Sequence, residues 1–180
     1  MSCITTYLKK CFDPTRAKAS DIEIGDIAHA LSLLCRANGH FIHFYSVGQH
    51  SLNCLKEAKM RGYSKRVQLG CLLHDASEAY LSDITRPVKP YLPQYLEIEE
   101  KLQNLIFDKW ITPSLTEEER KLVFGIDDDV LWYEFKTLMG EKLCETAPEI
   151  KSEPDYDFCD FLDIERSFLN EFNALIGSDL

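Results

Sequence analysis

The feature that most constrains the fold of this chain is a nearly continuous apolar segment that ends in two ionisable residues. The run from Val67 to Leu73 has Gln68 as its one polar side chain, and His74 and Asp75 follow it directly. A helix that is apolar nearly all round is buried, so we expect this segment to form the central helix. An interior carboxylate is costly unless a positive group such as a metal ion lies against it. The pair therefore predicts either a metal site or a His–Asp hydrogen bond that ends a core helix.

Apolar residues recur at helical spacing through most of the remaining chain, which predicts an all-α fold. Helices are expected over about 24–36, 46–60, 65–76, 94–110, 116–140 and 158–176. Ser46 with Gln49, and Thr116 with Glu119, form capping-box patterns at two of these starts. The first 20 residues are expected to form an irregular arm, and three prolines in 85–93 predict an ordered loop. A chain of 180 residues, 45% of them hydrophobic, fits a single helical-bundle domain over 1–180.

The composition argues against several classes of protein. A formal net charge of −10 disfavours binding to a nucleic acid polymer, which needs Lys and Arg clusters to neutralise phosphates. No apolar run reaches the roughly 20 residues of a membrane span, and no signal-peptide pattern is present. We therefore expect a cytoplasmic protein that has no membrane partner. The seven cysteines are odd in number and form no CxxC pair, which favours reduced core thiols over a disulfide framework.

Four ionisable side chains fall on the inward faces of three expected helices. His50 lies on the inner face of the second helix, His74 and Asp75 end the third, and Asp127 shares an apolar stripe of the fifth with Glu134. A lone histidine on such a stripe is usually a core residue with its hydrogen bonds made. Two histidines on facing stripes, one of them followed by an aspartate, favour a metal. Two nitrogens and two oxygens suit a single divalent ion such as Mn²⁺, Co²⁺, Ni²⁺, Fe²⁺ or Zn²⁺.

Further motifs accompany these residues: Ile27-Ala28-His29-Ala30-Leu31-Ser32, Cys35-Arg36, Gly39-His40, Phe44-Tyr45-Ser46-Val47-Gly48-Gln49-His50-Ser51, Leu73-His74-Asp75-Ala76-Ser77-Glu78-Ala79-Tyr80 and Asp83-Ile84. Together, over about residues 20–140, this pattern resembles the HD-domain metal-dependent phosphohydrolase superfamily. It is most similar to small bacterial and prophage HD proteins related to 5′-deoxynucleotidases. The resemblance implies an HD-domain helical bundle that holds one divalent metal ion, Mg²⁺ included among the candidates.

The resemblance also implies a metal-ligand set. The ligands are expected to be His50, His74, Asp75 and Asp127. In similar proteins the last aspartate precedes a glutamate by seven residues, which fits Asp127 and a glutamate at position 134. Asp128 stays open as an alternative, because neighbouring acids and an internal glycine blur the phase of that helix.

Catalytic and substrate-binding roles follow from the same resemblance. Glu78 is expected to handle protons or orient the attacking water, and Asp83 to lie near the sugar and the leaving oxygen. Arg36 is expected to contact phosphate, with His40 and Lys89 as further substrate-binding residues. Each has a plainer alternative: Lys89 as a solvated loop residue, His40 as a residue that holds a loop, and Arg36 as an exposed cation.

The implied function is hydrolysis of a (deoxy)nucleotide, with removal of the 5′-phosphate from deoxynucleoside monophosphates as the expected reaction. The alternatives are a dNTP triphosphohydrolase, a phosphodiesterase of cyclic or signalling nucleotides, and a non-catalytic nucleotide-binding regulatory module. Some characterised deoxynucleotidases carry an aromatic residue after the arginine, where this chain has Ala37. Their way of rejecting ribonucleotides is therefore not assumed. The metal, the base and the sugar stay open, as does the oligomeric state, with a homodimer as one option.

Overall fold

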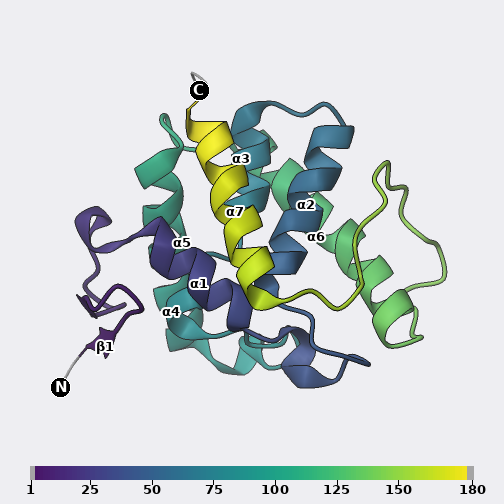
Figure 1. The fold of residues 1–180 in the computed structure, drawn as a ribbon, viewed down its shortest axis with the longest axis horizontal. Coiled ribbons are helices and arrows are strands. Elements are labelled where there is room, and N and C mark those ends of the chain that lie inside the picture. Colours follow the sequence, from purple (N-terminus) through teal and green to yellow (C-terminus); the bar gives the residue numbers. More distant parts are fainter. Residues whose placement is uncertain (1–2, 178–180) are drawn as a thin grey trace.

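The structure is a computed structural model that describes residues 3–177, and it consists of helices with one small N-terminal sheet (Figure 1). The longer helices are α1 (Ile24–Leu33), α2 (Val47–Met60), α3 (Lys65–Leu73), α5 (Pro93–Trp110), α6 (Glu117–Leu138) and α7 (Phe161–Ile176). The shorter elements are β1 (Ile4–Thr5), β2 (Cys11–Phe12), the one-turn helix α4 (Glu78–Leu81), and the 3-10 helices η1 (Ala19–Asp21), η2 (Arg36–Gly39) and η3 (Lys89–Tyr91). The expected all-α, single-domain fold is confirmed. Within residues 3–177, no helix is both long and apolar enough to cross a membrane.

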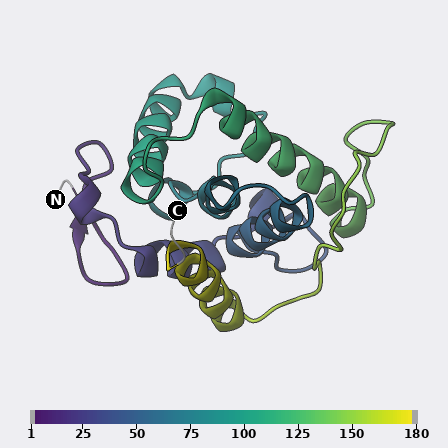
Figure 2. The same cartoon turned by 90° about the horizontal axis from the view of Figure 1, so that it is seen from above.

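Helix α3 occupies the centre of the fold, as its apolar sequence predicts. It contacts α2, α5, α6 and α7, and Figure 2 shows these helices arranged around it. Its buried side chains are Val67, Leu69, Cys71, Leu72 and Leu73. Gly70 faces α6 so closely that a Cβ atom there would lie 2.8 Å from Cγ2 of Val123. A larger residue at position 70 would therefore require α6 or the Val123 side chain to shift.

Capping residues set the starts of α2 and α6 close to the expected positions. At α2, the Ser46 hydroxyl accepts a hydrogen bond from the Gln49 amide. At α6, Thr116 and Glu119 form a complete reciprocal capping box. These caps satisfy amide donors that the first helical turn leaves unpaired. The first and last helices are shorter than expected by a few residues, but α2 and α6 differ from their expected ranges by two residues or fewer.

Helix α3 ends at Leu73, three residues earlier than expected, and the chain enters a tight turn. The Ala76 amide donates to the Leu73 carbonyl, which is the spacing of a turn rather than of an α-helix. Gln103 of α5 stabilises this break, because its side-chain amide donates to the Leu73 carbonyl and its side-chain oxygen accepts from the Ser77 amide. The two residues between, His74 and Asp75, therefore lie on a turn that a neighbouring helix holds in place.

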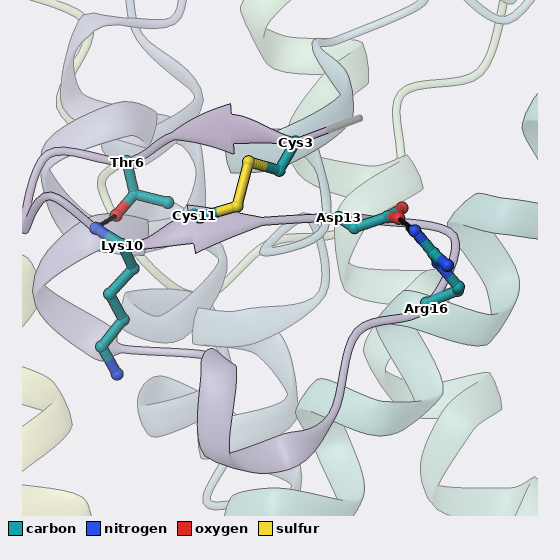
Figure 3. Close-up of a disulfide and its surroundings, with 6 residues drawn as sticks. All are labelled: Cys3, Thr6, Lys10, Cys11, Asp13 and Arg16. Carbon is teal, nitrogen blue, oxygen red and sulfur yellow. Dashed lines mark hydrogen bonds and ion pairs between the residues drawn. A yellow bond between two sulfur atoms is a disulfide. The ribbon is translucent and has the colours of Figure 1, made fainter. Parts of the chain in front are cut away.

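The N-terminal arm is a short hairpin closed by a disulfide between Cys3 and Cys11, which corrects the expectation of reduced thiols (Figure 3). The antiparallel strands β1 and β2 bring the two Cα atoms to 5.5 Å. The Lys10 amide donates to the Thr6 hydroxyl within the turn of the hairpin. No CxxC motif marks this pair, because the eight-residue separation becomes short only once the hairpin forms. The other cysteines in the described part of the chain are free thiols, at positions 35, 54, 71, 144 and 159.

The acidic segment after α6 is fastened to α2 by polar side chains. Glu57 accepts hydrogen bonds from the amides of Lys151 and Ser152. Asn53 accepts from the Asp155 amide, and Gln49 donates to the carbonyl of residue 155. Much of this connection is therefore a defined strap that crosses the outer side of α2 before α7 begins.

Candidate metal centre

Four ligand atoms from three parts of the fold lie together beside α3. The His50 Nε2 atom on α2 is 3.1 Å from His74 Nε2 and 3.0 Å from Asp127 Oδ1 on α6. Asp75 Oδ2 is 3.1 Å from His74 Nε2 and 3.7 Å from His50 Nε2, and His74 Nε2 is 3.7 Å from Asp127 Oδ1. Ligands bound about 2.1 Å from one ion lie roughly 3.0–3.4 Å apart. Three of the five distances lie in this range and two are 3.7 Å, so small shifts of the side chains would place all four atoms around a single cation.

Hydrogen bonds to the far side of each imidazole turn both Nε2 atoms toward this centre. The His50 Nδ1 atom is 2.6 Å from Glu134 Oε1, and the His74 Nδ1 atom is 2.8 Å from the Cys71 carbonyl oxygen. Because an ionised carboxylate and a carbonyl only accept hydrogen bonds, both Nδ1 atoms must donate. Each Nε2, once it has lost its proton, then offers its lone pair to the centre. Metal-binding histidines are held in this way, with the second ring nitrogen donating to a carboxylate or a carbonyl.

The two aspartates carry the charge that a cation requires. Burial alone raises the pKa of a carboxyl group, but His74 lowers the pKa of Asp75, and His50 and His74 lower that of Asp127. Burial opposes protonation of the two imidazoles, yet the surrounding carboxylates raise the pKa of both. Protons and a metal ion therefore compete for the same nitrogen atoms, and acid should weaken metal binding.

The thiol of Cys54 is a further donor near the two histidines. His50, Cys54 and His74 form a buried cluster whose donor atoms lie within 4.8 Å of one another and could hold a metal ion. The Cys54 sulfur is 3.6 Å from His50 Nε2, farther than the 3.0 Å of the Asp127 oxygen. Burial also raises the pKa of the Cys54 thiol well above its usual range, and a protonated thiol is a poor ligand. A bound metal ion deprotonates a coordinating thiol, so Cys54 is an alternative donor to the carboxylates of Asp75 and Asp127.

Arg36 and Glu134 form a buried charged layer behind the centre. The Arg36 guanidinium is 3.4 Å from Asp75 Oδ2 and 3.2 Å from Glu134 Oε2. Glu134 also accepts a hydrogen bond from the Tyr45 hydroxyl at 2.8 Å. Burial disfavours the charged forms of both residues, but their mutual attraction raises the pKa of Arg36 and helps lower that of Glu134. Both side chains therefore stay ionised at neutral pH.

Glu78 is a buried carboxyl group beside the centre. Among the described residues, its Oε2 atom has no hydrogen-bond partner, and its Oε1 atom is 3.8 Å from Lys89 Nζ. Burial raises the pKa of Glu78 well above its usual range, and the charges of Asp75 and Asp83 add to the effect. Burial likewise raises the pKa of Asp83. The environment thus makes Glu78 and Asp83 weaker acids than exposed carboxyl groups.

A cavity of about 370 Å³ opens over this group of residues. Its charged lining consists of Arg36, Asp75, Glu78, Asp83, Arg86, Lys89 and Asp127. Its apolar lining includes Ala37, Phe41, Leu131, Phe135 and Leu143. The volume falls in the range of small-molecule sites, about 300–1,000 Å³. The cavity therefore offers an amphipathic ligand both a charged region and an apolar wall.

The structure places two of the candidate site residues away from the centre. His40 is exposed, and the described residues that line the cavity do not include it. Ala37 and Asn38 adopt left-handed backbone angles, with φ of 51° and 50°, so the chain turns before it reaches His40. Asp128 is also exposed and pairs with Arg86, which leaves Asp127 as the aspartate that faces the two histidines. Lys89 does line the cavity, although its Nζ atom pairs with Glu99 at 2.8 Å.

Other members of the site were not expected from the sequence. Arg86 reaches from the proline-containing loop to α6, where it pairs with Asp127. Gln103 holds the turn after α3, and Tyr45 supports Glu134. The apolar wall near Phe135 was also not expected. Periodicity gave no signal for these residues, because their roles depend on contacts between segments distant in the sequence.

Comparison with known proteins identifies two relatives. The chain is 37% identical to the uncharacterized protein YfdR of Escherichia coli (strain K12) over 161 residues, which cover 82% of this chain and 86% of YfdR. It is 38% identical to the uncharacterized protein RCAP_rcc00048 of Rhodobacter capsulatus over 109 residues, which cover 57% of this chain and 54% of that protein. No family model matches the chain.

Proposed function

This chain belongs to the same family as YfdR of Escherichia coli, and we propose that it is a metal-dependent phosphohydrolase that acts on nucleotides. The reaction we favour removes the 5′-phosphate from deoxynucleoside monophosphates. One observation carries the proposal: two imidazole nitrogens and two carboxylate oxygens lie together at the charged region of a cavity that also has an apolar wall. A nucleotide is divided in the same way, with a charged phosphate and a flat, weakly polar base.

His50, His74, Asp75 and Asp127 would hold one divalent cation. When bound, such an ion lowers the pKa of a water molecule and polarises a phosphoryl oxygen. The same four residues carry the resemblance to HD-domain phosphohydrolases. Their mixed nitrogen and oxygen atoms suit Mn²⁺, Co²⁺, Ni²⁺, Fe²⁺ or Zn²⁺, and Mg²⁺ is tested with them.

Arg36 and Lys89 would stabilise the negative charge of the phosphate. Arg36 lies 3.4 Å from Asp75, so a phosphate held at the metal centre would meet its guanidinium group. Lys89 lines the same cavity, next to Glu78. Fixed positive groups aimed at developing charge lower the barrier of phosphoryl transfer, because they need no rearrangement during the reaction.

Glu78 and Asp83 would move protons between the attacking water and the leaving oxygen. Both line the cavity, and the pKa of each is raised. A carboxyl group of raised pKa can accept a proton from water and return it to the departing alkoxide. A regulatory module that only binds nucleotides has less need of two such groups beside a metal centre.

The apolar wall would receive the nucleoside. Phe41 meets Phe135 edge to face, with 5.5 Å between ring centroids, and Leu131 lies one helical turn before Phe135. A base can stack against such a surface regardless of its identity. Ala37 contributes a small side chain to the same cavity. The sugar preference is therefore a question for the assay, in which ribonucleotides are compared with deoxyribonucleotides.

The test is a phosphate-release screen on metal-stripped protein supplied with Mn²⁺, Co²⁺ or Mg²⁺. Deoxy- and ribonucleoside 5′-monophosphates, triphosphates and cyclic nucleotides are compared. We expect metal-dependent release of phosphate from deoxynucleoside monophosphates by the wild type. His74→Ala should lose both the bound metal and the activity, because one of the two nitrogen ligands is gone. His40→Ala, which changes an exposed histidine outside the cavity, should keep both.

The screen also separates the alternatives. Release of triphosphate from a dNTP, or opening of a cyclic nucleotide, would show that the protein is a different phosphohydrolase with the same metal chemistry. If the protein binds metal and nucleotide but releases no product, the proposal of an enzyme is wrong and a regulatory module takes its place. Normal metal content in purified His74→Ala would contradict the assignment of the metal centre to these residues.

A further inference from the structure

Arg86 lines the cavity and makes ion pairs that are more exposed to solvent than those of the other two cations that line it. Its guanidinium group reaches two neighbouring carboxylates on α6, at 2.7 Å from Asp127 Oδ2 and 2.6 Å from Asp128 Oδ1. Different nitrogen atoms make the two contacts: Nη2 donates to Asp127 and Nη1 donates to Asp128. Asp127 thus has one oxygen facing the two histidines and the other held by Arg86.

The other two cations that line this cavity are more firmly held. The Arg36 side chain is 10% exposed and lies between Asp75 and the buried Glu134, and the Lys89 side chain is 25% exposed and bound to Glu99. The Arg86 side chain is 59% exposed and the Asp128 side chain 61% exposed. An exposed ion pair contributes little to stability, because water solvates both partners well once they separate. The contact to Asp128 is therefore the one that a ligand can most easily displace.

Arg86 also lies where two cavities meet. A second cavity of about 500 Å³ opens on the α5 side, and the two share Asp75, Glu78, Arg86, Lys89 and Asp127 as lining residues. The ion pairs between Arg86 and α6 therefore lie beside the candidate metal centre, next to both cavities. Any phosphate that reaches the four ligand residues must come near this guanidinium group.

We propose that Arg86 binds the phosphate of the substrate through the nitrogen that Asp128 occupies in the free protein. The contact to Asp127 is kept, so the arginine joins the phosphate to a carboxylate of the metal centre. Planar guanidinium groups suit such paired contacts with carboxylate and phosphate oxygens. Asp128 then acts as an exposed competitor for the phosphate. This inference rests on the proposed function, since it assigns a residue to the same substrate.

The experiment measures binding of inorganic phosphate and of a deoxynucleoside without phosphate to metal-loaded protein by calorimetry. Arg86→Gln should weaken phosphate binding by about 10-fold to 100-fold, the range of one charged hydrogen bond. Asp128→Asn should strengthen it by several fold, because the competing carboxylate is removed. Glu118→Gln, which removes an exposed charge from the start of the same helix, controls for the general effect of net charge. Deoxynucleoside binding should be the same in all these proteins.

Three results would overturn the inference. They are unchanged phosphate affinity in Arg86→Gln, an Asp128→Asn variant that behaves like Glu118→Gln, and loss of the metal from Arg86→Gln. The last would make Arg86 a residue that positions Asp127. These results are distinct from failure of the proposed function. If the wild type hydrolyses no nucleotide but binds phosphate in a way that depends on Arg86 and Asp128, the proposed enzyme activity is wrong. The proposed phosphate-binding site is then still supported.

Discussion

Glu134 joins the candidate metal centre to the layer behind it through three side chains. It accepts hydrogen bonds from His50, Tyr45 and Arg36, and its side chain is fully buried. A buried carboxylate is costly, but three donors satisfy it and the positive charge of Arg36 offsets its own. The same contacts fix the orientation of the His50 ring. One residue thus couples the geometry of a nitrogen ligand to the position of the expected phosphate-binding arginine.

Substitution of Glu78 separates proton transfer from binding. Glu78→Gln keeps the size of the side chain but removes its ability to exchange a proton, so we expect the turnover rate to fall by about 10² to 10⁴. Metal content and nucleotide affinity should stay close to those of the wild type. Steady-state kinetics and metal analysis check this, with the exposed Glu97→Gln as the matched control. A loss of metal would instead place Glu78 among the ligands.

At the scale of elements, the strap of residues 139–160 depends on Glu57 of α2. The Arg61 side chain donates to Glu57 at 2.6 Å, and the amides of Lys151 and Ser152 donate to the same carboxylate. Burial alone would raise the pKa of Glu57, but the hydrogen bonds from Arg61 and Ser152 outweigh it and lower the pKa. The ionised form is therefore the one that stabilises the folded chain.

Replacement of Glu57 should destabilise the protein in a way that depends on pH. Glu57→Gln should lower the free energy of unfolding by about 1–3 kcal/mol at pH 7, the value of charged hydrogen bonds. Because the pKa is lower in the folded state, this contribution is complete above the unfolded value of about 4.3 and is lost as the pH falls through the folded pKa. Urea unfolding of wild type and variant at several pH values tests this, with Glu97→Gln as the control. A difference that stays constant into acid would contradict the assignment.

Local sequence patterns predicted the elements that carry the candidate ligands, because burial of one helical face and capping of a helix start are local properties. Ser46 and Thr116 marked α2 and α6 in this way. The turn after α3 was not predicted, since a side chain from α5, Gln103, stabilises it. Arg86 was missed for the same reason: its partners lie some 40 residues away in the sequence. The exposed position of His40 follows a turn that local patterns did not reveal, in which two non-glycine residues adopt left-handed angles.

For the whole molecule, the candidate metal centre is a junction between parts of the fold that are distant in sequence. His50 comes from α2, His74 and Asp75 from the turn after α3, and Asp127 from α6. An ion bound by all four would crosslink these elements in the folded state and find no such site in the unfolded chain. Metal binding should therefore contribute directly to stability.

Metal removal should lower the melting temperature. An ion present at about 100 times its dissociation constant stabilises the folded state by about 2.7 kcal/mol. In a chain of this size that corresponds to a shift of roughly 5–10 °C. Differential scanning calorimetry before and after chelation measures the shift, with His40→Ala expected to behave like the wild type. His74→Ala should show no shift, and an equal shift in that variant would contradict the assignment of the centre.

The close approach of α3 and α6 at Gly70 has a consequence for how this family can vary. A methyl group at position 70 would meet Val123 at 2.8 Å and Leu115 at 3.2 Å, so a larger residue there requires α6 to move or its side chains to shrink. Asp127 follows Val123 by one helical turn, and a displaced α6 would carry that carboxylate away from His50. Relatives that keep the centre should therefore change positions 70 and 123 together. The close packing at Gly70 therefore limits which substitutions in the core are compatible with the position of Asp127 beside His50.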